Sequence, residues 1–221
     1  MIKKIFSNLL DYIWPQFCLG CHQEGSLCCD ACAQNLKLLP LQPTPWTNPS
    51  YFYFQRCYVC LSYEDPLIEK LIKNFKYHYL ENLSQVLITI LQKQIQKIDL
   101  HPNTIIVNVP LHPRKKRQRG FDQTEILAKG LAKKLNLTYY PLLQRIKTTK
   151  TQAQLTKEQR QKNVAGVFKI NKKIPQQLQH QQPEIILIDD VATTGATLNQ
   201  AAKVLKKAGF EQITCAVLAK N

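Results

Sequence analysis

EIILIDDVATTGATLNQAAKVLKKAGFEQITCAVLAK, residues 184–220, decides the fold, because it contains a strand, a loop, a helix and a second strand in order. The apolar run 185–188 is short and uninterrupted, as in a parallel strand that is covered on both faces, and we expect Asp189 and Asp190 to end it. Gly209 occupies the position of a left-handed helix cap, and a second strand is predicted from about 212 to 219. The helix between them is indicated by apolar residues at helical spacing: Leu198, Ala201, Ala202, Leu205 and Ala208.

The loop between the first strand and the helix is a candidate anion site. In open α/β folds, ligands bind at the carboxyl edge of the sheet, where a helix start offers free N–H groups and a positive dipole end. Thr193, Thr194 and Thr197 supply hydroxyl donors, and Gly195 lets the backbone approach a phosphate closely. A plain turn whose threonines only cap the helix is the alternative.

The two acids before the loop suit a different part of the same ligand. Asp189 and Asp190 could accept hydrogen bonds from ribose hydroxyls, or share a Mg²⁺ with a second phosphate. Other nucleotide motifs are missing, because none of the seven glycines forms a G-x-x-x-x-G-K-[ST] or a G-x-G-x-x-G loop. The acids are therefore not part of a Walker-type site.

Composition predicts one α/β core with a small appendage. The chain has 221 residues, is 44% hydrophobic and carries a formal net charge of +15. Residues 112–173 hold seventeen Lys and Arg against three acids, so nearly all of the excess charge lies in one stretch, which favours polyanions. No apolar run reaches the length of a membrane span, and the opening residues lack a signal-peptide pattern. Eight cysteines in such a chain indicate metal or reduced thiols in the cytoplasm.

Four of these cysteines predict a structural zinc site. Cys18-x2-Cys21 and Cys29-x2-Cys32 form two knuckles whose thiolates can converge on one tetrahedral Zn²⁺. Cys28 is an alternative to Cys29, although Cys29 repeats the spacing of the first knuckle. His22 could also replace a ligand. We expect residues 1–40 to form an N-terminal helix plus this knuckle, 41–50 a Pro-rich linker, and 51–221 the main domain.

The remaining elements follow from periodicity. Residues 51–63 read as a strand, so Cys57 and Cys60 point to opposite faces and cannot chelate one ion. Helical spacing predicts two helices within 65–97. A buried strand (104–110), a helix (123–135) and two short strands (142–145 and 166–170) complete the set, and a long polar excursion joins the two short strands.

A basic loop follows the strand at 104–110 and should lie on the same sheet edge as the two acids. Asp122 and Glu125 are predicted to cap the next helix as a pair. The loop could meet a pyrophosphate or a nucleic-acid backbone, or could simply be solvated. It places five cations within six residues: Arg114, Lys115, Lys116, Arg117 and Arg119.

IILIDDVATTGAT resembles the phosphoribosyl pyrophosphate (PRPP) loop of type I phosphoribosyltransferases. The resemblance implies a mostly parallel α/β sheet flanked by helices, and Mg²⁺ bound together with PRPP. It assigns Asp189 and Asp190 to the ribose hydroxyls, as candidate catalytic residues. The 5′-phosphate would be bound by the loop that follows: Thr193, Thr194, Gly195, Ala196 and Thr197.

Further motifs widen the resemblance to essentially the whole chain. RGFDQ (119–123), QAQLTKEQRQKNVAGVF (152–168) and DDVATTGAT (189–197) are similar to motifs of the ComF/ComFC family of competence proteins. This family combines an N-terminal zinc knuckle with a phosphoribosyltransferase domain, and it is implicated in DNA uptake. Asp122 stands where Asn is expected in RGFNQ.

Two functions therefore remain. The first is a cytoplasmic competence protein that binds single-stranded DNA and PRPP and works with DNA-uptake, helicase or recombination machinery. The second is a phosphoribosyltransferase that acts on an unknown small nucleophile, with catalysis by positioning and electrostatics. The charge of residues 112–173 favours the first, and the intact acid pair favours retained PRPP binding.

Overall fold

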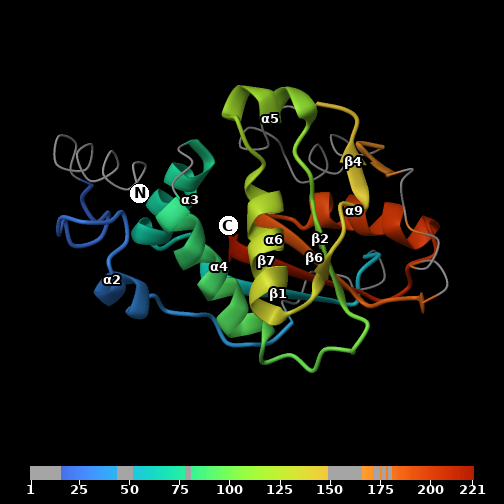
Figure 1. The fold of residues 1–221 in the computed structure, drawn as a ribbon, viewed down its shortest axis with the longest axis horizontal. Coiled ribbons are helices and arrows are strands. Elements are labelled where there is room, and N and C mark those ends of the chain that lie inside the picture. The colour runs from blue at the N-terminus through green and yellow to red at the C-terminus, as the bar shows by residue number, and fades with distance from the viewer. Residues whose placement is uncertain are drawn as a thin grey trace, which may run out of the picture.

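The chain folds around a five-stranded sheet in which every pair of neighbouring strands is parallel (Figure 1). This computed structural model describes residues 16–43, 52–77, 81–148, 166–171, 175, 178 and 181–221. The order across the sheet is β1-β7-β6-β2-β3. The bounds, in that order, are Arg56–Ser62, Ile213–Lys220, Ile185–Ala192, Ile105–Asn108 and Thr138–Tyr139. The mostly parallel sheet flanked by helices that the sequence predicts is confirmed.

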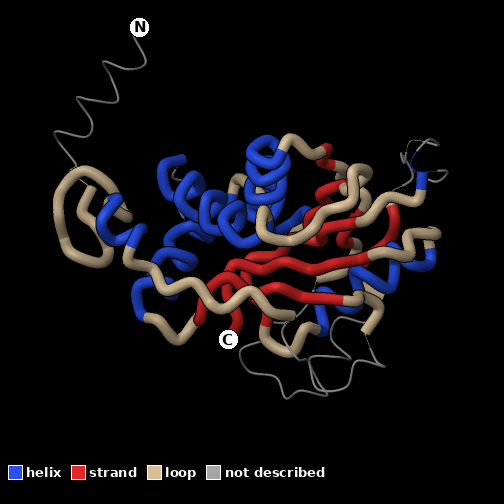
Figure 2. Tube along the Cα trace, turned by 90° about the horizontal axis from the view of Figure 1, so that it is seen from below, coloured by secondary structure: helices blue, strands red, loops and turns tan. Residues whose placement is uncertain are grey.

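Helices cover both faces of the sheet (Figure 2). One apolar cluster packs α3 (Pro66–Tyr77), α4 (Glu81–Ile95) and α6 (Gln123–Leu135) on the first face. A second cluster packs α9 (Ala196–Lys207) on the other face. Both clusters draw on alternate residues of the central strands, which explains why those strands are apolar without interruption.

The final strand, loop, helix and strand form as expected, with one correction. β6 does not end at the acids but continues to Ala192, because β7 goes on pairing with it as far as Lys220. Asp189 and Asp190 therefore lie inside the strand and are only 9% and 6% exposed. The expectation that the acids end the strand is wrong, and their burial has electrostatic consequences. Gly209 has a φ of +96°, as predicted for the helix end.

The predicted basic loop is also corrected, because most of it is the helix α5 (Pro113–Arg119). Pro113 stands at its first turn, where a missing N–H costs nothing, and His112 caps it by accepting a hydrogen bond from the Arg114 N–H. Gly120 ends the helix in the left-handed conformation, with a φ of +86°. In Figure 1, α5 lies beside the end of the sheet at the top of the view.

Several other expected elements are present. The helix at 123–135 is α6, and Asp122 caps it by accepting from the N–H groups of Thr124 and Glu125. The two short strands are β4 (Leu143–Arg145) and β5 (Phe168–Ile170), which pair antiparallel. The N-terminal helix, most of the Pro-rich linker and the polar excursion at 149–165 fall outside the described residues.

Cys57 and Cys60 belong to β1 and point to opposite faces of the sheet, as the strand period requires. Cys57 is buried in the α9 cluster and Cys60 in the cluster on the other face. Both side chains are at most 1% exposed. They therefore serve as core residues and do not form a third knuckle.

The cysteine-rich segment packs on the face of the sheet that carries α3 and α4. Cys28 and Leu36 belong to the same apolar cluster as these helices. A Cβ on Gly20 would lie 3.2 Å from Leu67 in α3, so the backbone of the knuckle approaches that helix closely. Of the helices in the described ranges, none has the length and apolar character of a membrane span.

Candidate functional site

The two acids lie near the carboxyl end of β6, where the segment after the neighbouring strand β2 also leaves the sheet. That segment runs through Leu111 into α5 and returns at Asp122. Its two ends are tied together, because the Leu111 N–H donates to Asp122 Oδ2 at 2.8 Å. The segment that contains α5 therefore forms a loop with joined ends, and it lies at the same edge of the sheet as the acids.

Asp190 is the charged member of the acid pair. Its Oδ2 lies 3.1 Å from Lys76 Nζ and accepts a hydrogen bond of 2.9 Å from Gln123 Nε2. Its Oδ1 accepts from the Val191 N–H at 2.6 Å. Burial alone would raise the pKa of Asp190, but the Lys76 ammonium and the Gln123 amide outweigh it and hold this pKa below its usual range.

Asp189 has the opposite electrostatic character. Burial and the neighbouring charge of Asp190 hold the pKa of Asp189 well above its usual range. Its Oδ1 accepts a hydrogen bond of 2.8 Å from the Asp190 N–H. The pair therefore favours a state with one negative charge, which is carried by Asp190.

Cations surround this pair in a pocket of about 200 Å³. They come from three separate elements, namely the end of α3, the inner side of α5 and the end of β4. Partial burial, together with the charges of its neighbours, lowers the pKa of Lys115. Four cations thus face an acid pair that favours one charge, and the pocket is electrostatically suited to an anion: Lys76, Lys115, Arg119 and Arg145.

The helix divides the five predicted cations into three sets. Lys115 and Arg119, one turn apart, line the pocket with the acids. Lys116 instead pairs with Glu125 at 2.6 Å, so Glu125 uses its carboxylate on this lysine and on Lys129 rather than closing the capping box. Arg114 and Arg117 are exposed to solvent on α5.

The loop after the acids forms the continuation of the pocket. Asp189, Val191 and Thr197 line both the cation-rich pocket and the small hollow over this loop. Gly195 begins α9 with a φ of +74° and offers no side chain to cap it. The hollow is lined by Thr193, Gly195, Ala196 and Thr197, four of the five loop residues predicted from the sequence. Thr194 instead lies 3.4 Å, through its hydroxyl, from the Ala196 N–H.

A larger cavity of about 590 Å³ adjoins the acid pocket. The two share Pro110, Leu111 and Arg145 as lining residues. Tyr139 forms part of its wall and donates a hydrogen bond from its hydroxyl to Asn108 at 2.8 Å. The cavity lies between the start of α5 and the β4–β5 hairpin, and its size is typical of a small-molecule site.

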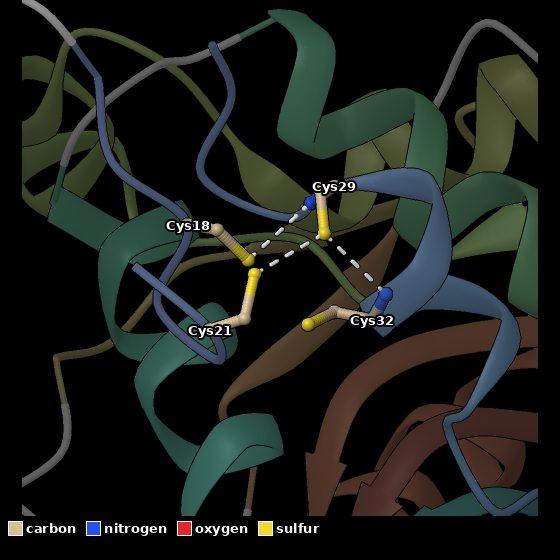
Figure 3. Close-up of side chains that lie close together, drawn as sticks. All are labelled: Cys18, Cys21, Cys29 and Cys32. Carbon is tan, nitrogen blue, oxygen red and sulfur yellow. Dashed lines mark hydrogen bonds between the residues drawn. The ribbon is translucent and has the colours of Figure 1, made fainter. Parts of the chain in front are cut away.

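The four predicted zinc ligands converge on one point (Figure 3). Their Sγ atoms all lie within 4.8 Å of one another, and a tetrahedral Zn²⁺ with bonds of about 2.3 Å needs about 3.8 Å between sulfurs. Cys21 and Cys29 are already 3.5 Å apart. The donor set therefore fits a structural metal of the zinc type. Cys18 and Cys21 come from a turn, and Cys29 and Cys32 from the start of α2 (Asp30–Gln34).

The thiols of this cluster differ from that of Cys28. Burial opposes ionisation of Cys18, but the backbone N–H groups around it outweigh this and lower its pKa to about 6. Hydrogen bonds to the neighbouring sulfurs raise the pKa of Cys32, which is expected when thiols share protons that a metal would displace. Cys28 lies outside the cluster, where burial raises its pKa to about 11. Exposed His22 is not part of the cluster either.

Among the polar residues that line the acid pocket, those that sequence reasoning missed include Lys76, Gln123 and Arg145. Lys76 and Arg145 belong to elements that were predicted from apolar periodicity or from a β-pattern, and Gln123 begins the helix that was predicted from its capping pair. A cation in the last turn of a helix is common and carries no sign of a distant partner. Gln123 had a weak signal, since it directly follows the predicted cap residue within RGFDQ.

Comparison with known families agrees with this arrangement. A family model described as "Phosphoribosyl transferase domain" matches residues 125–221, which include β6, the loop and α9. The fold and the matched residues together define a protein with a phosphoribosyltransferase-type domain. The match begins within α6, so it does not include α3, α5 or the cysteine cluster.

Three relatives carry names that refer to competence or DNA utilization, and two of them match most of the chain. "Competence protein F" of Haemophilus influenzae is 27% identical over 218 residues, which are 89% of this chain and 93% of that protein. "DNA utilization protein YhgH" of Salmonella typhimurium is 28% identical over 83% of this chain and 84% of its own length. "Competence protein ComFC" of Streptococcus pneumoniae is 28% identical over 59% of this chain and 53% of its own. In its cysteine cluster and its transferase-type domain, the chain is similar to these relatives, which carry the names of the ComF/ComFC family.

Solved structures with similarity to the chain include an adenine phosphoribosyltransferase and a glutamine PRPP amidotransferase. Adenine phosphoribosyltransferase of Saccharomyces cerevisiae is 16% identical, with a TM-score of 0.37, over 66% of this chain and 72% of its own. Glutamine PRPP amidotransferase of B. subtilis is 12% identical, with a TM-score of 0.41, over 66% of this chain and 30% of its own.

Proposed function

We propose that this protein acts in DNA uptake during natural transformation, in the cytoplasm, by binding single-stranded DNA and PRPP. The names of its relatives, competence protein and DNA utilization protein, support the biological process. The polyanion partner is supported by a net charge of +15, of which the stretch 112–173 holds nearly all. DNA-uptake, helicase or recombination machinery would be its protein partners.

The observation that carries PRPP binding is the excess of cations around the acid pair. Lys115, Arg119 and Arg145 line one pocket, where burial and the neighbouring positive charges lower the pKa of Lys115, so an anion that enters would relieve their repulsion. PRPP supplies a pyrophosphate for the cations, a ribose diol for the acids, and a 5′-phosphate for the loop at 193–197. These three groups match the three parts of the site in chemistry and in order.

Mg²⁺ would enter together with PRPP and neutralise part of the pyrophosphate charge. The ionised Asp190 accepts a ribose hydroxyl, and Asp189 completes the diol contact. The zinc-type cluster has a structural role, since it joins two short segments that have little apolar core of their own. We assign residues 1–40 to this zinc-bound unit, 41–50 to the linker and 51–221 to the transferase-type domain.

We assign the DNA backbone to the outer side of α5. Arg114 and Arg117 are exposed, whereas Lys115 and Arg119 line the acid pocket, so one helix can serve two anions on two sides. Each single-strand phosphate contact contributes about 0.7 to the slope of log affinity against log salt. Binding should therefore be largely independent of sequence and should weaken steeply with salt.

Two double variants separate these assignments. Arg114→Ala with Arg117→Ala should lower the salt slope for single-stranded DNA by about 1.4 and leave PRPP affinity unchanged. Lys115→Ala with Arg119→Ala should weaken PRPP binding at least about tenfold and keep the DNA salt slope. Fluorescence anisotropy with oligonucleotides and calorimetry with PRPP and Mg²⁺ measure the two affinities.

A matched control removes the same charge elsewhere. Lys133→Ala with Lys134→Ala lies at the far end of α6, away from the carboxyl edge, and should change neither quantity. If the Arg114 and Arg117 variant keeps the full DNA slope, the DNA contact is not on α5. The candidates would then be Lys147 and four residues outside the described ranges: Lys150, Lys157, Arg160 and Lys162.

The second candidate function is a phosphoribosyltransferase with a small nucleophile as acceptor. The 590 Å³ cavity favours it, since this cavity shares a wall with the acid pocket and could hold an acceptor beside the ribose. The surrounding cations would stabilise the charge of the leaving pyrophosphate. Release of pyrophosphate from PRPP with nucleobases or ammonium as acceptors, lost on Asp190→Asn, would establish turnover.

A further inference from the structure

The ion pair between Lys76 and Asp190 joins the acid site to a helix that lies outside the matched transferase residues. Lys76 is in the last turn of α3, and its Nζ is 3.1 Å from Asp190 Oδ2. The side chains are 25% and 8% exposed. The pair is therefore largely desolvated, and its partners are held by packing rather than by chance contact at the surface.

This contact occupies the carboxylate that a ribose would use. Asp190 Oδ2 accepts from both Lys76 and Gln123, and Oδ1 accepts from the Val191 N–H. These donors fill three of the roughly four acceptor positions of the carboxylate and both of those on Oδ2, so a ribose hydroxyl that binds Oδ2 must displace a protein donor.

Lys76 is the donor best able to leave. The Val191 N–H belongs to strand β6, and the Gln123 amide is held by a hydrogen bond from Arg119. The lysine ammonium, in contrast, is carried on a flexible four-carbon stem. If Lys76 left Asp190, its buried ammonium would have no partner unless the ligand supplied a new one.

A pyrophosphate supplies that partner. Lys76 lines the same pocket as Lys115 and Arg119, the residues assigned above to the pyrophosphate. We propose that Lys76 exchanges partners on binding, from Asp190 in the free protein to the pyrophosphate of the ligand, so that Asp190 becomes available to the ribose. This inference rests on the proposed binding of PRPP.

Partner exchange makes Lys76 a specificity-determining residue. A ribose phosphate without pyrophosphate must displace Lys76 from Asp190 and offers it nothing in return. PRPP displaces the same lysine and binds it again. Lys76 therefore selects for ligands that carry both a ribose diol and a pyrophosphate.

The test compares PRPP with ribose 5-phosphate, each titrated with Mg²⁺ into wild type and Lys76→Met by calorimetry. Lys76→Met should bind PRPP at least about tenfold more weakly, because a charge-assisted contact is lost. It should bind ribose 5-phosphate with unchanged or higher affinity, because the competing ammonium is gone. If the Met variant does not fold, Lys76→Gln replaces it, because it keeps a neutral donor near Asp190. It should likewise lose affinity for PRPP and keep its affinity for ribose 5-phosphate.

Lys73→Met is the matched control, since Lys73 lies one turn earlier in α3 and pairs with Glu69 at the surface. It should leave both affinities unchanged. An equal loss of both ligands in the Lys76 variants would mean that Lys76 only positions Asp190, and would overturn the exchange. No change in either affinity would overturn it as well. If wild type binds neither ligand, the proposed PRPP binding fails and this inference fails with it.

Discussion

Gln123 and Asp190 are joined by a hydrogen bond of 2.9 Å between the side-chain amide nitrogen and Oδ2, although 67 positions separate them in the chain. The same amide accepts, through its oxygen, a hydrogen bond from Arg119 in α5. Gln123 is 4% exposed. One buried amide therefore connects the basic helix to the acid pair and fixes the orientation of both.

Replacing Gln123 tests this connection. Gln123→Met keeps the side-chain length but removes the donor to Asp190 and the acceptor for Arg119, so PRPP affinity should fall about tenfold. Gln118→Met, on the exposed part of α5, is the control and should bind as wild type does. Calorimetry with PRPP and Mg²⁺ measures both. Equal affinity of the two variants would show that the connection has no part in binding.

The two acids should have opposite effects on stability. Asp189 has a raised pKa, so its ionisation costs stability as pH rises above about 4, the value for the unfolded chain. Asp189→Asn should therefore raise the melting temperature at pH 8, and this gain should disappear below about pH 4.

Asp190 has a lowered pKa and contributes stability above the unfolded value, which is lost as pH falls through the folded value. Asp190→Asn also leaves Lys76 without its anionic partner, so it should lower the melting temperature at neutral pH. Thermal unfolding between pH 3 and 9 measures both variants. Shifts of the same sign at pH 8 would contradict the asymmetry of the pair.

The cysteine cluster predicts one tightly held Zn²⁺ per chain. Cys18→Ser combined with Cys29→Ser should abolish zinc binding, whereas Cys28→Ala should retain one ion, because Cys28 lies in the apolar core outside the cluster. Zinc affinity should decrease as pH falls, since metal and protons compete for the thiolates. Elemental analysis of purified protein decides the matter, and two ions per chain or an ion retained by the Cys18 and Cys29 variant would refute the assignment.

Gly130 marks a close approach between α6 and α4. A Cβ at this position would lie 2.2 Å from Ile88 Cδ1, well inside contact distance. Gly130→Ala should therefore lower the free energy of unfolding by about 1–3 kcal/mol, although alanine is the better helix former. Adding Ile88→Val should restore part of the lost free energy of unfolding, as measured by urea unfolding. A Gly130→Ala protein that is more stable than wild type would show that the helices can separate at no cost.

The fold could be read from the sequence where local signals agree. The apolar run 185–188, the cap at Asp122 and the period-2 placement of Cys57 and Cys60 each depend on near neighbours in the chain. α5 was missed although Pro113 and Gly120 mark its two ends, because a dense run of cations is usually a solvated loop.

The site could be predicted only in part. Asp189 and Asp190 were identified from their pattern, but their burial depends on β7 pairing beyond them, which no local signal indicates. Lys76 and Arg145 reach the pocket from elements 114 and 45 positions before Asp190, and only the folded chain brings them there. The opposite pKa shifts of the two acids follow from these distant partners.

The central claim is that the acid pair at the carboxyl edge of β6 binds the ribose of PRPP. The most direct test is a calorimetric titration of PRPP with Mg²⁺ into wild type and into the Asp189→Asn, Asp190→Asn double variant. Zinc content and cooperative unfolding serve as controls for the fold. The loss of charge-assisted hydrogen bonds, each about 1.5–3 kcal/mol, predicts an affinity at least tenfold lower in the variant. An unchanged affinity, with the fold intact, would contradict the claim.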